Sequence, residues 1–344
     1  MATLNDIDQM KNLDKDKMAS FITDLPKQCL DAYQKAKKIE IPENWKEIKN
    51  IVIAGMGASA IGGDLIYALT KKEVKIPIFS VRDWHLPNFV DQKSLVILVS
   101  YSGKTKETLS CLKEAKEKGA NIFVISSNQN LKEKNSFIFN FKGESRAAFG
   151  YLFIPLLVLF EKINLINLNK FEIENSLNEL EKYNQQFLPE VEAEENLAKF
   201  IAYHFYENIP FIISIPFYSP VARRWKTQIN ENGKNFAFWE EIPEIFHNTI
   251  EGILPKRIKD ELFVLIFEDP KNFLEYKNSL QVFERYLDEE NISWEAISPF
   301  GSNQFIKILS LILLGDWVSF YLAMLNNVDP TPVEKIKWFK SQIY

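Results

Sequence analysis

Short, largely apolar segments alternate with longer helix-like segments along most of this chain. In the first half the apolar segments are NIVIAG (50–55), SLVILVS (94–100) and ANIFVISS (120–127). A strand that is apolar on both faces needs cover on both faces, and strands that alternate with helices pair in parallel. The alternation therefore predicts an α/β fold in which helices flank a mainly parallel sheet.

The same alternation returns in the second half of the chain. Its apolar segments are IPFIISIP (209–216), ELFVLIFE (261–268) and ISWEAISP (292–299), whereas the stretch between the two halves is charged and rich in Asn and Glu. At 344 residues the chain is long enough for two domains. We predict an N-terminal helical segment (residues 1–40), a first α/β domain (41–165), a helical linker (166–195) and a second α/β domain (196–344).

Composition narrows the classes of function. The formal charge of −5, without a cluster of Lys and Arg, argues against a nucleic-acid partner. Cys29 and Cys111 show no metal-ligand spacing, so we expect reduced core thiols in a cytoplasmic protein. The apolar runs 149–160 and 305–328 predict buried helices and no membrane partner, because the first is too short to span a bilayer and Asp316 interrupts the second.

The first strand–helix junction, IVIAGMGASAIGG (51–63), contains a glycine pattern with two interpretations. Gly55, Gly57 and Ala60 have the G-x-G-x-x-A spacing of a dinucleotide-binding turn. The next strand ends in SVRDW, where Asp83 or Arg82 could contact a ribose or its 2′-phosphate. An NADP-dependent oxidoreductase is therefore one candidate.

The other interpretation is a phosphate cradle formed by two junctions. Ser59 follows the tight turn at Gly57, and SYSGKT after the next buried strand contributes Ser100, Ser102 and Thr105. Helix N-termini favour anions, and parallel strands bring their carboxyl ends together. Ser59 and Thr105 could instead be ordinary helix caps. The two junctions taken together favour the cradle.

Several motifs make the resemblance to a family specific. GMGASAIGGDL and SYSGKTKET resemble the phosphate-binding segments of the sugar isomerase (SIS) domain. SRAAFGYLFIPL, RRWKTQINENGK, EIPEIFHNTIEG and DPTPVEKIKWFK resemble the bifunctional phosphoglucose/phosphomannose isomerase family, in the family's order, from about residue 50 to the end. The resemblance implies two SIS domains and a homodimer whose active sites are shared between subunits. It also implies isomerisation of glucose 6-phosphate and mannose 6-phosphate to fructose 6-phosphate, without metal or cofactor.

The resemblance also implies roles for individual residues. A carboxylate would move a proton between C2 and C1, a guanidinium would stabilise the cis-enediol, and a histidine and a lysine would open the sugar ring. Taken alone, each of these residues is more simply a structural or solvated side chain, although an arginine that starts an apolar helix suggests a partner anion. The residues implied for phosphate binding are Gly57, Ser59, Ser100, Ser102 and Thr105. The resemblance implies Glu231 as the base, Arg146 as the guanidinium that stabilises the enediol, and His247 and Lys340 as the residues that open the ring.

The chain departs from the family pattern at a few positions. Ala58 stands where a glycine is common, Lys104 and Lys106 add positive charge near the cradle, and Thr249 replaces a frequent glutamate. These departures leave the preference between glucose and mannose phosphates open. A non-catalytic SIS module that senses a sugar phosphate is a further alternative, which the matching base, histidine and lysine disfavour.

Overall fold

A computed structural model describes residues 4–252 and 254–343, which group into two compact units. The first-sheet unit comprises Asp24–Glu181 and Ser302–Ile306, and the second-sheet unit comprises Met1–Thr23, Lys182–Gly301 and Lys307–Tyr344. Both units are therefore discontinuous in sequence. The predicted domain boundaries at residues 40, 165 and 195 remain predictions.

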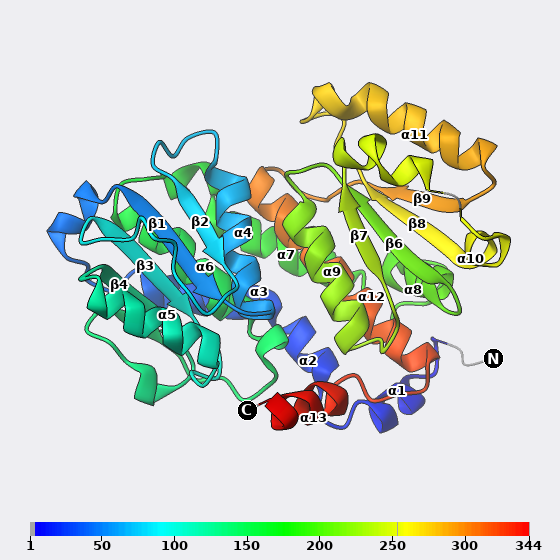
Figure 1. Cartoon of the computed structure of the whole chain (residues 1–344). Helices are drawn as coiled ribbons and strands as arrows, with labels where there is room; N and C mark the ends of the chain where they lie inside the picture. The colour runs from blue at the N-terminus through cyan, green and yellow to red at the C-terminus, as the bar shows by residue number, and fades with distance from the viewer. Residues whose placement is uncertain (1–3, 253, 344) are drawn as a thin grey trace. The chain divides into compact units, whose positions relative to one another are not determined.

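A parallel sheet forms the centre of the first-sheet unit (Figure 1). Its strand order is β2-β1-β3-β4-β5, and the register pairs Asn50 with Ser94 and Leu95 with Asn121. The predicted α/β class is confirmed. The strands are β1 (Asn50–Gly55), β2 (Ile78–Val81), β3 (Ser94–Val99), β4 (Asn121–Ser126) and β5 (Ser136–Ile138).

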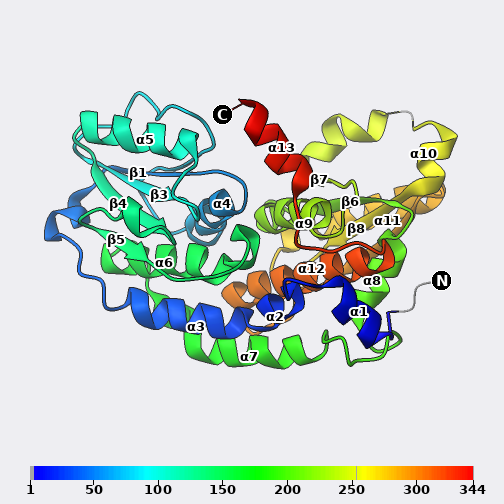
Figure 2. The same ribbon diagram turned by 90° about the horizontal axis from the view of Figure 1, so that it is seen from below.

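Helices cover both faces of this sheet, as the apolar strands require (Figure 2). On one face α5 (Lys106–Glu117) buries Cys111, Leu112 and Ala115 against valines and leucines of β1 and β3. On the other face α4 (Ala58–Thr70) packs beside the apolar α6 (Phe149–Lys162), and α3 (Leu25–Ala36) packs against α6. The strand ends that carry the predicted cradle are thus fixed between two helical layers.

A second parallel sheet, of order β7-β6-β8-β9, forms the centre of the second-sheet unit. Its register pairs Phe211 with Phe238 and Ile209 with Leu262. The helix α9 (Ser219–Glu231) packs on β6 and β7, and α11 (Lys277–Glu289) packs on β9. The strands are β6 (Ile209–Ser214), β7 (Phe238–Glu241), β8 (Leu262–Phe267) and β9 (Ser293–Ile297).

Further helices complete the chain. They are α1 (Ile7–Leu13), α2 (Met18–Thr23), α7 (Ile173–Gln185), α8 (Leu197–Phe205), α10 (Lys256–Glu261), α12 (Gln304–Leu325) and α13 (Glu334–Ile343). By length and composition α12 could cross a membrane, but its most apolar window is entirely buried inside the structure. Burial of this run agrees with the prediction, and Cys29 and Cys111 are buried free thiols, as expected.

The sequence also predicts an amphipathic helical segment over about residues 14–38 that is interrupted near Pro26, and the structure agrees, because α2 ends at Thr23 and α3 begins at Leu25. Asp14 accepts hydrogen bonds from the amides of Met18 (2.7 Å) and Ala19 (2.9 Å) at the start of α2. Pro26 lies in the first turn of α3, where its missing N–H has no helical acceptor to lose. The interruption therefore lies just before the proline, which is in the first turn of the second helix.

The sequence also predicts a helix for EIPEIFHNTIEGI (241–253); this prediction is wrong over residues 241–252, and Ile253 lies outside the described residues. The strand β7 extends to Glu241, and two short 3-10 turns follow, η5 (Glu244–His247) and η6 (Thr249–Glu251). They are separated at Asn248, which has an extended φ of −152° and accepts a hydrogen bond from the amide of Thr249 at 2.6 Å. An asparagine that bonds its own neighbouring backbone competes with helix propagation.

Candidate functional site

The residues of the predicted cradle gather at the carboxyl ends of β1 and β3 in the first-sheet unit. Ser59 lies in the first turn of α4 and is buried, and Ser100 directly follows β3 and is 2% exposed. The amide of Tyr101 donates to the Ser59 hydroxyl at 3.4 Å, so the two junctions are in contact. Ser102 is exposed, and Thr105 occupies the N-cap position of α5.

Two glycines give the cradle its tight turns. Gly57, at the N-cap position of α4, has a φ of +54°, and Gly103 in the second junction has a φ of +62°. A Cβ atom on Gly103 would lie 2.7 Å from the Cβ of Asn128. Both turns therefore need the conformational freedom of glycine, and the second also needs its lack of a side chain.

The cradle hydroxyls are not used as helix caps. Gly57 and not Ser59 occupies the N-cap position of α4, and Thr105 makes no side-chain capping hydrogen bond. The Ser100 hydroxyl is buried and has no hydrogen-bond partner among the residues that the structure describes. Since an unpaired buried hydroxyl costs about 1–3 kcal/mol, this atom fits a bound acceptor such as a phosphate oxygen.

Side chains at the end of β4 bond to the loop between β3 and α5, residues 100–105, which we call the cradle loop. Three side chains bond to successive carbonyl groups of the loop: Ser126 to Ser100 (2.7 Å), Ser127 to Tyr101 (2.7 Å) and Asn128 to Ser102 (2.9 Å). These supporting residues, Ser126, Ser127 and Asn128, are not among those predicted from the sequence. The polar run SSN directly after an apolar strand was the signal that could have found them.

Arg146 lies in the same unit as the cradle, in the turn η3 (Ser145–Ala147) that packs against α4. Its side chain is 2% exposed, and Nη1 lies 3.6 Å from a carboxylate oxygen of Glu144. The phenol of Tyr101 donates to the carbonyls of Phe141 (3.2 Å) and Gly143 (2.5 Å). The cradle loop is therefore bonded to the segment that leads into Arg146.

The dinucleotide interpretation of the first junction has less support. The strand order β2-β1-β3-β4-β5 is that of flavodoxin-like folds, whereas the dinucleotide fold has the order 3-2-1-4-5-6. Arg82 forms an ion pair with Asp64, and Asp83 accepts a hydrogen bond from the amide of Trp84 at 2.6 Å. The two side chains expected to contact a ribose are thus engaged within the protein.

The corresponding strand ends of the second sheet carry carboxylates in place of unpaired hydroxyls. Ser219, at the start of α9, donates to the carboxylate of Glu241 at 2.5 Å. Asp269, just after β8, accepts from the Tyr218 hydroxyl at 2.9 Å and from Lys307 at 2.8 Å. A phosphate would meet negative charge here, so the chemistry of this edge does not repeat the cradle.

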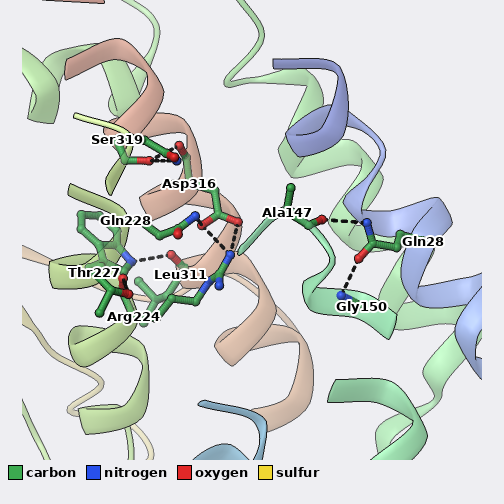
Figure 3. Close-up of polar contacts among 11 residues, drawn as sticks. Gln28, Ala147, Gly150, Arg224, Thr227, Gln228, Leu311, Asp316 and Ser319 are labelled. Carbon is green, nitrogen blue, oxygen red and sulfur yellow. Dashed lines mark hydrogen bonds and ion pairs between the residues drawn. The ribbon is translucent and has the colours of Figure 1, made fainter. Parts of the chain in front are cut away.

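Glu231 is the last residue of α9 in the second-sheet unit, where it is partly exposed. Buried polar contacts anchor this end of the helix to α12 (Figure 3). Gln228 donates to the Asp316 carboxylate at 2.8 Å, and Asn232 donates to the Ser319 hydroxyl at 3.0 Å. The position of the Glu231 backbone is therefore fixed on both sides of the residue.

His247 and Lys340 lie on two other elements of the second-sheet unit. The exposed ring of His247 ends η5, and the exposed Lys340 is in the last turn of α13. Thr249, the departure nearest to His247, donates from its hydroxyl to a carboxylate oxygen of Glu240 at 2.6 Å. The structure thus gathers the cradle residues at one edge, whereas Glu231, His247 and Lys340 come from α9, η5 and α13.

Comparison with known proteins gives matches over both sheets. Residues 46–139 match the SIS domain, and residues 194–343 match the bacterial phospho-glucose isomerase C-terminal SIS domain. A bifunctional phosphoglucose/phosphomannose isomerase of Caldicellulosiruptor bescii is 37% identical, over 95% of this chain and 98% of the relative. This chain belongs to the bifunctional phosphoglucose/phosphomannose isomerase family.

Another member agrees with this family assignment, and a more distant solved structure shows the same fold. The family member from Aquifex aeolicus is 32% identical, over 88% of this chain and 93% of its own length. The crystal structure of tagatose-6-phosphate ketose/aldose isomerase from Escherichia coli has the same fold, with a TM-score of 0.67 at 14% identity over 90% and 92% of the two chains. The predicted fold of two SIS domains is confirmed.

Proposed function

We propose that this chain is an aldose–ketose isomerase that interconverts glucose 6-phosphate, and also mannose 6-phosphate, with fructose 6-phosphate. The buried Ser100 hydroxyl carries the proposal, because it lacks a partner among the described residues and because the next residue, Tyr101, bonds through its amide to Ser59 of the other junction. A monophosphate supplies the several acceptors that such hydroxyls and amides need. Membership in the family adds the class of sugar and the reaction.

In the proposed reaction Glu231 acts as the base. Its carboxylate takes the proton from C2 of the open-chain aldose and returns it to C1, while the proton on O2 passes to O1. The cis-enediol between these steps carries developing negative charge on oxygen, which the Arg146 guanidinium stabilises. Net, the carbonyl moves from C1 to C2, and no atom is gained or lost.

The remaining residues act before and around this proton transfer. Gly57, Ser59, Ser100, Ser102 and Thr105 hold the phosphate, so that the reacting carbons are presented at a constant position. His247 and Lys340 move the proton between the ring oxygen and the anomeric hydroxyl when the ring opens. The proposal includes a cytoplasmic homodimer in which the His247 of one subunit serves the active site of the other.

The direct test is Glu231→Gln, assayed in both directions with glucose 6-phosphate and mannose 6-phosphate. We expect kcat to fall at least a thousandfold with both sugars, because the amide cannot accept the C2 proton. Glu289→Gln is the matched control, since Glu289 is the last residue of α11 just as Glu231 is the last residue of α9. Turnover near the wild-type rate in the Glu231 variant would refute the mechanism.

Two further measurements address the other interpretations of the sequence. A sugar-phosphate sensor would bind glucose 6-phosphate in equilibrium dialysis but would give no fructose 6-phosphate. An NADP-dependent oxidoreductase would enhance nicotinamide fluorescence on binding. We expect this chain to form fructose 6-phosphate and to cause no change in nicotinamide fluorescence.

A further inference from the structure

The side-chain amide of Gln28, on α3, bonds to the backbone on both sides of the start of α6 (Figure 3). Its Nε2 donates to the carbonyl of Ala147 at 2.9 Å, and its Oε1 accepts from the amide of Gly150 at 2.6 Å. Gln28 is 5% exposed. A planar amide that uses both of its polar groups fixes the distance and the angle between the two backbone groups that it contacts.

These contacts satisfy groups that a helix start leaves unpaired. Gly150 is in the first turn of α6, where amide groups have no intrahelical acceptor, and Ala148 at the N-cap position supplies no side-chain bond. Gln28 thus caps α6 from outside the helix. The same side chain also holds the carbonyl at the end of η3.

Close packing leaves this junction little freedom to shift. A Cβ atom on Gly150 would lie 2.9 Å from the backbone nitrogen of Cys29 and 3.0 Å from its sulfur. The start of α6 therefore touches the backbone of α3. A change in the position of the Gln28 side chain therefore also moves the turn η3, because these closely packed elements leave little room between them.

We propose that Gln28 is a positioning residue for Arg146. The carbonyl that it holds belongs to Ala147, the residue directly after Arg146, and the buried Arg146 side chain has little room to compensate for a moved backbone. The inference rests on the proposed function, in which Arg146 stabilises the enediol. A displacement of about 1 Å at such a group can cost up to a hundredfold in rate.

The test compares Gln28→Met, which keeps the length of the side chain but removes both bonds, with Gln28→Asn, which keeps the amide one methylene shorter. We expect kcat to fall about tenfold or more in both variants, with KM and competitive inhibition by inorganic phosphate within twofold of the wild type. In an Arg146→Ala background, Gln28→Met should cause no further loss of kcat, because it acts through the missing side chain. Unchanged kcat in both single variants, or an independent loss in the double variant, would overturn the inference.

Two controls separate this inference from general stability and from the proposed function. Thr70→Val removes another buried hydrogen bond of the same unit, from Thr70 to the carbonyl of Ile66 (2.6 Å), and should leave kcat unchanged. If Arg146→Ala alone retains wild-type turnover, the role of Arg146 in the proposed function is wrong. If Arg146→Ala is inactive while both Gln28 variants keep the wild-type kcat, only the proposed role of Gln28 is wrong.

Discussion

The ammonium group of Lys234 donates a hydrogen bond to the backbone carbonyl of Glu231, three residues earlier. The same Nζ donates to the carbonyls of Pro330 at 3.2 Å and Pro332 at 2.6 Å. Three acceptors match the three donors of an ammonium group. Lys234 therefore connects the end of α9 to the segment that leads into α13, the helix with Lys340.

We predict that Lys234→Met lowers kcat about tenfold and leaves KM within about twofold. The substitution frees the Glu231 carbonyl and the segment at 330–332, so the proposed base loses its position while the cradle is untouched. Steady-state kinetics with glucose 6-phosphate measures the effect. Lys271→Met, at an exposed lysine of the same unit, is the control and should behave as wild type.

We predict that Gly103→Ala raises KM at least tenfold, because its Cβ would collide with Asn128 at 2.7 Å and displace the cradle loop. Gly119→Ala is the matched control. Gly119 has a similar φ of +68°, but the nearest neighbour of its added Cβ is the Cγ of the flexible Gln92 side chain at 3.2 Å. Both variants carry the same backbone strain and should lose similar thermal stability, so a KM that rises equally in both would contradict the cradle.

The buried ion pair between Arg224 and Asp316 gives a prediction about stability. Nη2 lies 2.9 and 2.8 Å from the two carboxylate oxygens, and the residues are 1% and 5% exposed. Asp316→Ala should lower the free energy of unfolding by about 3–5 kcal/mol, because it removes one partner of a buried ion pair. Urea unfolding measures the change. The double variant Arg224→Met/Asp316→Leu should be more stable than Asp316→Ala, and the opposite order would contradict this account.

A hydrogen bond whose strength depends on pH joins the exposed His85 to Glu114 of α5. His85 Nδ1 lies 2.5 Å from the Glu114 carboxylate, and this hydrogen bond raises the pKa of His85 above its ordinary value of 6.5. A raised pKa means that the stabilisation is fully present below pH 6.5 and is lost as the pH rises through the raised value. At about pH 6 the melting temperature of the wild type should therefore be higher than that of His85→Gln. At about pH 9 the two melting temperatures should be equal. A difference in melting temperature that does not change with pH would contradict the pair.

Lys104 is a departure from the family pattern within the second junction of the cradle. Its side chain is exposed, and its amide donates to the Ser102 hydroxyl at 3.2 Å. We predict that Lys104→Asn raises KM two- to threefold at low salt, since a nearby charge attracts the phosphate, and that the difference disappears at about 1 M salt. A KM equal to the wild-type value at low salt would make Lys104 a surface substitution without a role in binding.

The sequence by itself determined the fold class and the proximity of the two strand–helix junctions that we propose as the cradle. Apolar runs such as SLVILVS cannot remain in water, and strands buried on both faces form parallel sheets under helices. The carboxyl ends of adjacent parallel strands meet, so the junctions at Ser59 and Ser100 had to be neighbours. These conclusions use only local pattern and general rules of topology.

Only the tertiary structure decided which polar groups are paired. Ser219 starts a helix after a buried strand much as Ser59 does, yet its hydroxyl is bonded to Glu241, whereas the hydroxyl of Ser100 is left without a partner among the described residues. Gln28 meets Ala147 across 119 positions, and Arg224 meets Asp316 across 92. The physical reason is that a hydrogen bond between distant side chains depends on how whole elements pack, and no periodicity or local propensity encodes that.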